Sequence, residues 1–358
     1  MGYFRYFCGM NAEDKKPLIG MDIAGLRAVA AECGLPAFAA KQIAHWIYGK
    51  RVDSIDAMTD LSKRGREALA AGWCVGRETP KACSRSTDGT AKYLFRGAGG
   101  RDIEAVYIPD RDRATLCVSS QAGCRMGCTF CMTGRQGFHG NLSAAQIVNQ
   151  ILSIPESDSL TNIVFMGMGE PLDNFDAVLA ATRVLTESWG LAWSPKRITV
   201  STVGHLPSLR RLLAESKVHV ALSVHTPFAD ERAGMMPVEK AWPVADVMAV
   251  LREYDFAHQR RLSVEYTMWR GINDDMRHAD ALARLLRGSS ARANLIRYHA
   301  IPGGAMQPSA QKTMEAFRDR LNERGVTATI RASRGEDIEA ACGMLAGKDN
   351  NHNNPTEK

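Results

Sequence analysis

Three cysteines in one short segment are the residues of this sequence best suited to catalysis. Cys124, Cys128 and Cys131 are separated by three residues and then by two. Thiolates at this spacing can each bind one iron of a cubic [4Fe-4S] cluster, which leaves the fourth iron without a protein ligand. The alternative is a structural zinc site with Cys117 as fourth ligand, but zinc sites usually pair their cysteines in two Cys-x2-Cys units. The spacing therefore predicts an iron-sulfur cluster with one open iron.

The same spacing resembles that of radical S-adenosylmethionine (SAM) enzymes. In those enzymes the amino and carboxylate groups of SAM bind the open iron, and one electron from the cluster breaks a carbon-sulfur bond of SAM to give a 5'-deoxyadenosyl radical. The resemblance implies two cofactors, a [4Fe-4S] cluster and SAM.

Length and composition limit the class of protein. The chain has 358 residues with 45% hydrophobic content, which suffices for one large domain and a small one. Neither an apolar run of about 18 residues nor a charged-then-apolar leader is found, so we expect a cytoplasmic protein without a membrane segment. Thiols stay reduced in that compartment, which disfavours a disulfide scaffold. The net charge of +6 is compatible with a polyanionic partner but does not require one.

Hydrophobic periodicity divides the chain into parts. The beginning of the chain has helical spacing, and residues 92–109 then alternate as strands do. Polar composition marks the last residues as disordered. The expected parts are a helical accessory domain at 1–85, a β extension or linker at 86–113, a core at 114–347 and a disordered tail at 348–358.

Strand and helix patterns alternate through the core. Six such units predict an α/β fold, a partial (β/α)6 barrel with helices outside and the loops after the strands at one mouth. A last strand near 326–331 and a helix around 336–346 are expected beyond the sixth unit. The six strands are predicted near 114–119, 161–166, 197–202, 217–224, 261–268 and 292–298.

Polar and small residues follow several of these strands and thus belong to the mouth. Glycines there let a backbone approach a ligand closely, and a carboxylate can accept the ammonium group of SAM. The residues concerned are Gly169 and Glu170 after the second strand, Ser201 after the third, and Ser223, Val224 and His225 after the fourth.

Glu104 is a local anomaly, a carboxylate on the same strand face as Val106 and Ile108. A structural explanation is that Glu104 points to solvent at a sheet edge or pairs with an arginine. A catalytic role for the Glu104 carboxylate would explain its position equally well.

Four segments together resemble the RlmN/Cfr family of radical SAM RNA adenine methyltransferases, and most closely its RlmN branch. The resemblance covers about residues 92–345, and the helical N-terminal part is similar to the RNA-binding accessory domain of that family. The segments are 117–131, 165–172, 223–227 and 334–343.

The resemblance implies a mechanism and roles for individual residues. Cys342 would take a methyl group from one SAM, and a second SAM would supply the radical that activates it. Glu104 would be the base that removes the ring hydrogen, and Cys117 would release the RNA by attacking Cys342, which leaves a transient disulfide. Contacts with SAM would come from Gly169, Glu170, Ser201, Ser223, Val224 and His225.

One departure from the family pattern bears on a SAM contact, and one agreement bears on which ring carbon is methylated. His299 stands after the sixth strand where most members have asparagine, so a SAM contact there would be made by an imidazole. Pro171 after Gly-Glu is typical of the carbon-2 branch, whereas the Cfr-type carbon-8 branch more often has alanine. The resemblance then implies adenine 2503 of 23S rRNA and adenine 37 of tRNAs as targets.

The resemblance also implies an electron donor such as flavodoxin or ferredoxin, and we expect a monomer. A radical SAM enzyme acting on a non-RNA substrate is the other alternative, since it would need the cluster but not the pair of Cys117 and Cys342.

Overall fold

The computed structural model describes residues 15–256, 258 and 260–346. These residues form two compact units, which are considered separately. One contains the chain up to residue 79 with 143–153 and 180–193, and the other contains 80–142, 154–179 and the chain from 194 onward. The tail predicted to be disordered lies outside the described residues, and the predicted domain boundaries at 85 and 113 stay predictions.

The first unit is mainly helical, as the periodicity predicted. Asp22 begins its first helix by accepting the backbone N–H of Gly25 at 2.8 Å, and Leu26 and Ile43 are buried between the first helices. A short parallel pair, β1 (Lys16–Pro17) with β2 (Trp73–Cys74), completes it. The helices are α1 (Ile23–Glu32), α2 (Ala39–Ala44), a π-helical turn (His45–Gly49), α3 (Lys63–Gly72) and α5 (Ala144–Leu152).

The second unit is built on one sheet of ten strands in the order β14-β13-β12-β11-β10-β9-β6-β5-β4-β3. From β6 to β14 all neighbours are parallel, whereas β3, β4 and β5 are antiparallel. The strands are β3 (Ala82–Arg85), β4 (Ala91–Arg96), β5 (Asp102–Asp110), β6 (Arg113–Cys117), β9 (Asn162–Phe165), β10 (Ile198–Thr202), β11 (His219–Ser223), β12 (Leu262–Met268), β13 (Arg292–Arg297) and β14 (Ala328–Ile330).

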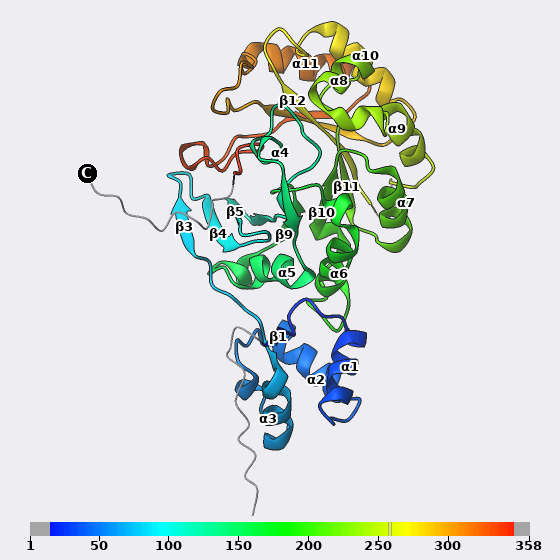
Figure 1. Ribbon diagram of the computed structural model, residues 1–358. Coiled ribbons are helices and arrows are strands. Elements are labelled where there is room, and N and C mark those ends of the chain that lie inside the picture. Colours follow the sequence, from blue (N-terminus) through cyan, green and yellow to red (C-terminus); the bar gives the residue numbers. More distant parts are fainter. Residues whose placement is uncertain (1–14, 257, 259, 347–358) are drawn as a thin grey trace, which may run out of the picture. The chain divides into compact units, whose positions relative to one another are not determined.

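Helices alternate with the parallel strands, so the prediction of a partial barrel is confirmed. The sheet stays open, because β3 and β14 are its two edges, and β14 adds a seventh parallel strand. Figure 1 shows β9 to β12 side by side, with helices outside them. The helices are α6 (Phe175–Thr186), α7 (Leu206–Glu215), α8 (Ala229–Met235), α9 (Val244–Arg252), α10 (Met276–Leu286) and α11 (Gln311–Glu323).

The expected helix at 336–346 is wrong. Only one 3-10 turn, Glu336–Ile338, forms there. Gly335 and Glu339 on either side of it adopt left-handed backbone conformations, with φ of 62° and 53°, and Gly343 has φ of 86°. Because left-handed residues end a right-handed helix, the segment stays a loop. None of the described helices is long and apolar enough to cross a membrane.

Candidate active site

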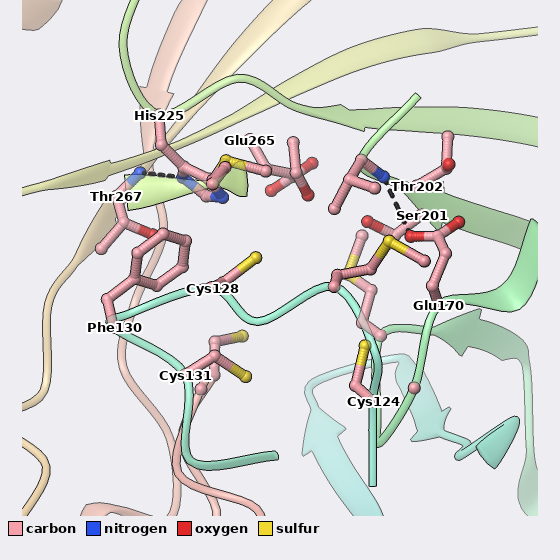
Figure 2. A pocket seen from close by; sticks show the side chains of 18 of the residues that line it. Cys124, Cys128, Phe130, Cys131, Glu170, Ser201, Thr202, His225, Glu265 and Thr267 are labelled. Atoms are coloured by element: carbon pink, nitrogen blue, oxygen red, sulfur yellow. Dashed lines mark hydrogen bonds between the residues drawn. The ribbon is translucent and has the colours of Figure 1, made fainter. Parts of the chain in front are cut away.

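The loop that carries the three cysteines lies between β7 (Gln121–Gly123) and α4 (Met132–Arg135). β7 pairs with β8 (Phe138–Asn141), and the N–H of Cys124 donates to the carbonyl of Gly137 at 2.8 Å. This small hairpin therefore fixes the first cysteine, and the α4 turn follows the last. The sulfur atoms of Cys124, Cys128 and Cys131 point into one cavity (Figure 2).

The thiols fit a multi-iron cluster. Burial, with smaller effects from neighbouring acidic groups, raises the pKa of Cys124 to about 12, and burial also raises the pKa of Cys128. Thiolates here thus need a nearby cation, as iron would provide. The three sulfur atoms share one cavity, as the ligands of a single cluster must.

The cavity is open to solvent, and its empty space of about 920 Å³ includes that open mouth. The predicted residues Glu104, Cys117, Val224 and His299 are not part of its lining. Nine predicted residues line it together: Cys124, Cys128, Cys131, Gly169, Glu170, Ser201, Ser223, His225 and Cys342.

Glu170 joins the ends of two strands at the mouth. One of its oxygens accepts the N–H of Leu172 at 3.1 Å, and the other accepts the N–H of Val203 at 3.0 Å. Burial raises its pKa to about 7, although bonds from Thr202 and Val203 act in the opposite direction. The carboxylate still lines the cavity, where an ammonium group would stabilise its charged form.

Gly169 is required by the packing of its own chain. Its φ is +97°, and an added Cβ would lie 2.5 Å from the Cβ of Gln121. The expected reason for a glycine here was the close approach of a ligand. The structure shows a second reason, because Gly169 lets this turn pack on β7.

His225 is held as a neutral imidazole. Its Nδ1 accepts the N–H of Thr267 at 3.0 Å, and its carbonyl accepts the Asn273 amide at 2.6 Å. Burial, aided by Arg232, lowers its pKa to about 3. Because Nδ1 is an acceptor, the ring proton is assigned to Nε2. A φ of 60° is a sparsely populated conformation for histidine, and such strain often marks functional sites.

Glu265 on β12 is a lining residue that the sequence reasoning missed. Its Oε1 accepts Ser263 Oγ at 3.0 Å and Asn294 Nδ2 at 2.8 Å. Its Oε2 is buried without a hydrogen-bond donor among the described residues and lies 3.5 Å from Arg331 Nη1. The carboxylate lines the cavity with Arg331 as its ion-pair partner, and a carboxylate can accept hydrogen bonds from the hydroxyl groups of a ligand. The signal was available, since Glu265 is a lone carboxylate in an apolar strand, as Glu104 is.

The C-terminal loop brings Cys342 to the cysteine loop. The N–H of Met132 donates to the carbonyl of Gly343 at 2.9 Å, and Thr133 Oγ1 donates to the carbonyl of Leu345 at 2.7 Å. Cys342 is exposed and lines the cavity. The end of the chain's described part is thus fastened directly beside the predicted cluster ligands.

Cys117, at the end of β6, lies close enough to Cys342 for the two thiols to interact. Burial is the main cause that raises the pKa of Cys117 to about 12, and the neighbouring Cys342 sulfur adds to it. Both thiols are free in this structure. Two neighbouring free thiols are a candidate pair for a transient disulfide.

Glu104 is buried, and its expected structural explanation is wrong. β5 is an interior strand between β4 and β6, so its carboxylate does not reach solvent at an edge. Its partner is a lysine and not an arginine: Lys92 Nζ lies 3.1 Å from Oε1. The N–H of Ala346 donates to Oε2 at 3.0 Å.

His299 interacts with the C-terminal segment. Its Nε2 lies 3.1 Å from Ser333 Oγ, and its Nδ1 lies 3.6 Å from a carboxylate oxygen of Glu336. Burial lowers its pKa. His299 thus supports the chain between β14 and Cys342.

Comparisons with known proteins agree with this site. The family described as the radical SAM superfamily matches residues 118–283, and the family described as the ribosomal RNA large subunit methyltransferase N-terminal domain matches residues 16–75. A Parabacteroides distasonis protein named probable dual-specificity RNA methyltransferase RlmN is 55% identical over 93% of this chain and 97% of its own length. The dual-specificity RNA methyltransferase RlmN of Halorhodospira halophila is 42% identical over 95% of this chain and 96% of its own.

A solved structure extends the likeness to the fold. The crystal structure of a radical SAM methyltransferase from Sphaerobacter thermophilus has a TM-score of 0.86 and 39% identity, and it covers 92% of this chain and 98% of that chain. The open parallel sheet with a three-cysteine loop after its first parallel strand defines a radical SAM enzyme. More particularly, the chain belongs to the RlmN family of radical SAM RNA methyltransferases. It is a SAM-dependent RNA methyltransferase whose cofactors are a [4Fe-4S] cluster and SAM.

Proposed function

We propose that this enzyme methylates carbon 2 of adenine 2503 in 23S rRNA and of adenine 37 in tRNAs. The relatives named dual-specificity RNA methyltransferases support two classes of RNA substrate. The observation that carries the proposal is that Cys342 lines the cavity of the cysteine loop while the buried Cys117 lies close enough to interact with it. A radical SAM enzyme for a non-RNA substrate would have no use for this pair.

The cluster would be held by Cys124, Cys128 and Cys131, whose sulfur atoms line the cavity. When bound, the cluster and SAM supply a one-electron cleavage that lets a hydrogen atom be removed from an unactivated methyl group. Two SAM molecules would be used per turnover, one as methyl donor and one as radical source. Contacts with SAM would come from Gly169, Glu170, Ser201, Ser223, Val224 and His225, with Glu265 added from the structure and His299 acting through the C-terminal segment.

Cys342 would be the methyl carrier. Its thiolate attacks the methyl carbon of the first SAM and displaces S-adenosylhomocysteine. After a hydrogen atom is removed from this methyl group, the sulfur-bound carbon forms a bond to the adenine ring. The RNA is then joined to the enzyme through a thioether, and the ring still carries the hydrogen that it must lose.

Glu104 and Cys117 would complete the reaction. Glu104, as general base, takes the ring proton. One electron leaves the ring together with this proton, and the oxidised cluster would be its acceptor. The Cys117 thiolate then attacks the Cys342 sulfur, so that a disulfide forms as the carbon-sulfur bond to RNA breaks. The freed carbon takes up a proton to complete the methyl group, and an external thiol reductant reopens the disulfide.

The wider setting follows from this chemistry. Electrons would come from a small donor such as flavodoxin or ferredoxin, and the enzyme would work as a monomer in the cytoplasm on irregular RNA whose target base is unstacked. Pro171 after Glu170 supports carbon 2. Methylation at carbon 8 of the same adenine would contradict that choice.

The test uses Cys117→Ala in the reconstituted enzyme with an RNA fragment. A protein-RNA adduct that survives denaturation is expected, because nothing remains to release the thioether. Cys342→Ala should give no adduct, and Cys83→Ala, which changes an exposed thiol far from the cavity residues in sequence, should behave like the wild type. Absence of any adduct in Cys117→Ala, despite normal SAM cleavage, would reject the proposed function.

A further inference from the structure

Lys92 contacts the carboxylate of Glu104 from the neighbouring strand. In the β4–β5 pair Leu94 lies opposite Glu104, and Lys92 lies opposite Val106. Lys92 is thus a diagonal neighbour of Glu104 on the same sheet face, within reach of a long side chain. Its Nζ lies 3.1 Å from Oε1, and the two side chains are only 13% and 6% exposed.

The same ammonium group reaches the chain that leads to Cys342. Lys92 Nζ donates to the carbonyl of Glu339 at 3.3 Å, three residues before the cysteine. On the other side of the cysteine, the N–H of Ala346 donates to Glu104 Oε2 at 3.0 Å. The Lys92–Glu104 pair therefore bonds to the Cys342 loop both before and after its sulfur.

This arrangement fixes the carboxylate and not only the loop. The loop has its own attachments through Met132 and Thr133, which do not involve Lys92. Glu104 Oε1, by contrast, has Lys92 as its ion-pair partner. A cation at this distance makes a charge-assisted bond that orients the carboxylate, and without it the oxygen would be buried with its charge unpaired.

We propose that Lys92 is a positioning residue for the methylation reaction, which holds the Glu104 carboxylate in register with the methyl-carrying loop. The proposal rests on the proposed roles of Glu104 and Cys342. Because the loop keeps its other attachments, loss of Lys92 leaves Cys342 able to accept a methyl group. It slows the later step, in which the adenine proton moves to Glu104.

A matched control lies on the same hairpin. Lys81 Nζ forms an ion pair with Asp102 Oδ2 at 2.7 Å, two residues before Glu104 on β5. Asp102 is also almost fully buried. Lys81→Met therefore removes a comparable lysine-carboxylate pair without touching Glu104 or the Cys342 loop.

The experiment follows one turnover of the reconstituted holoenzyme with an RNA fragment in Lys92→Met, Lys92→Arg and Lys81→Met. It records 5'-deoxyadenosine, the methyl group on Cys342 by peptide mass, the covalent RNA adduct and the methylated RNA. For Lys92→Met we expect normal cluster content and Cys342 methylation, with an adduct that persists at least about tenfold longer, since a general base contributes roughly 10²–10⁴ in rate. Lys92→Arg should restore most of the rate, and Lys81→Met should match the wild type.

Two results would overturn the role of Lys92. One is an adduct lifetime in Lys92→Met equal to that in Lys81→Met. The other is a parallel fall in cluster content, Cys342 methylation and product, which would show a purely structural role. If neither the wild type nor the Cys117→Ala variant forms an adduct, the proposed function itself is wrong.

Discussion

Arg232 and Glu239 form an ion pair in the interior of the second unit. Their side chains are 0% and 5% exposed. Arg232 also donates to the carbonyls of Val203 and Ser223, at 3.0 and 2.9 Å. One guanidinium thus joins the chain after β10 to the end of β11, the two places that present Ser201 and Ser223 to the cavity.

Arg232→Met should destabilise the protein strongly. It leaves Glu239 buried without its partner, a change that typically costs about 3–5 kcal/mol. Urea unfolding followed by circular dichroism measures this loss. Arg210→Met is the control, because the Arg210–Glu253 pair is about half exposed and such pairs contribute about 1 kcal/mol or less. Equal effects of the two substitutions would contradict the structural role of the buried pair.

His225 should make stability fall as the pH falls. Its pKa is lowered from 6.5 to about 3 in the folded protein, so below pH 6.5 the unfolded chain takes up a proton that the folded chain does not. The free energy of unfolding is therefore unaffected by His225 above pH 6.5, and it falls progressively as the pH is lowered from 6.5 toward 3. Lowering the pH from 7.5 to 5.5 should reduce the free energy of unfolding by about 1.4 kcal/mol for one such group.

The matched variant for this effect is His225→Asn. Asparagine tolerates the left-handed backbone at this position and can accept the Thr267 N–H as Nδ1 does. Urea unfolding at pH 7.5 and 5.5 should show a smaller pH dependence for His225→Asn than for the wild type. If the pH dependence of stability is as large in His225→Asn as in the wild type, groups other than His225 cause it.

Glu265→Gln should weaken SAM binding. Replacing the buried Oε2 by an amide group removes a charged acceptor from the cavity, and a hydrogen bond to a charged group contributes about 1.5–3 kcal/mol. We expect the Kd for SAM, measured by equilibrium dialysis, to rise by roughly tenfold or more. Glu253→Gln, on the exposed end of α9, should leave the Kd unchanged. A normal Kd in Glu265→Gln would remove Glu265 from the SAM site.

Lys63 and Arg64 should contribute to RNA affinity. Both are exposed at the start of α3, whereas Arg66 donates to the carbonyl of Leu61 and helps to hold its own turn. The double variant Lys63→Gln/Arg64→Gln should have a lower RNA affinity. The slope of log affinity against log salt concentration should become shallower by about 1 for each lost phosphate contact. SAM cleavage should stay normal, and Arg27→Gln on α1 serves as control. An unchanged affinity would argue against this helix as an RNA contact.

Much of the core was predictable because its signals are local. Alternation of strands and helices located each parallel strand to within a few residues, and the cysteine spacing located the loop whose three thiols share one cavity. The helix expected at 336–346 failed because the pattern of its apolar residues does not reveal the left-handed conformation of Glu339. The carbonyl of Glu339 accepts a hydrogen bond from Lys92, a residue far away in the sequence.

Site residues were predictable from the sequence only where a polar residue directly follows a predicted strand. Glu170 and His225 follow strands and were found, whereas Glu265 lies within a strand and was not. The pairing of Glu104 with Lys92 could not be foreseen, because it depends on strand register and not on distance in sequence. Register is a property of the assembled sheet.

The most direct measurement is the mass of the methylated adenine after turnover with SAM that carries a CD3 methyl group. Passage of the methyl carbon through Cys342, with loss of one hydrogen on the way, predicts a product methyl group that holds two deuterium atoms. A product that keeps all three would mean direct transfer from SAM to the ring, and it would contradict the role given to Cys342.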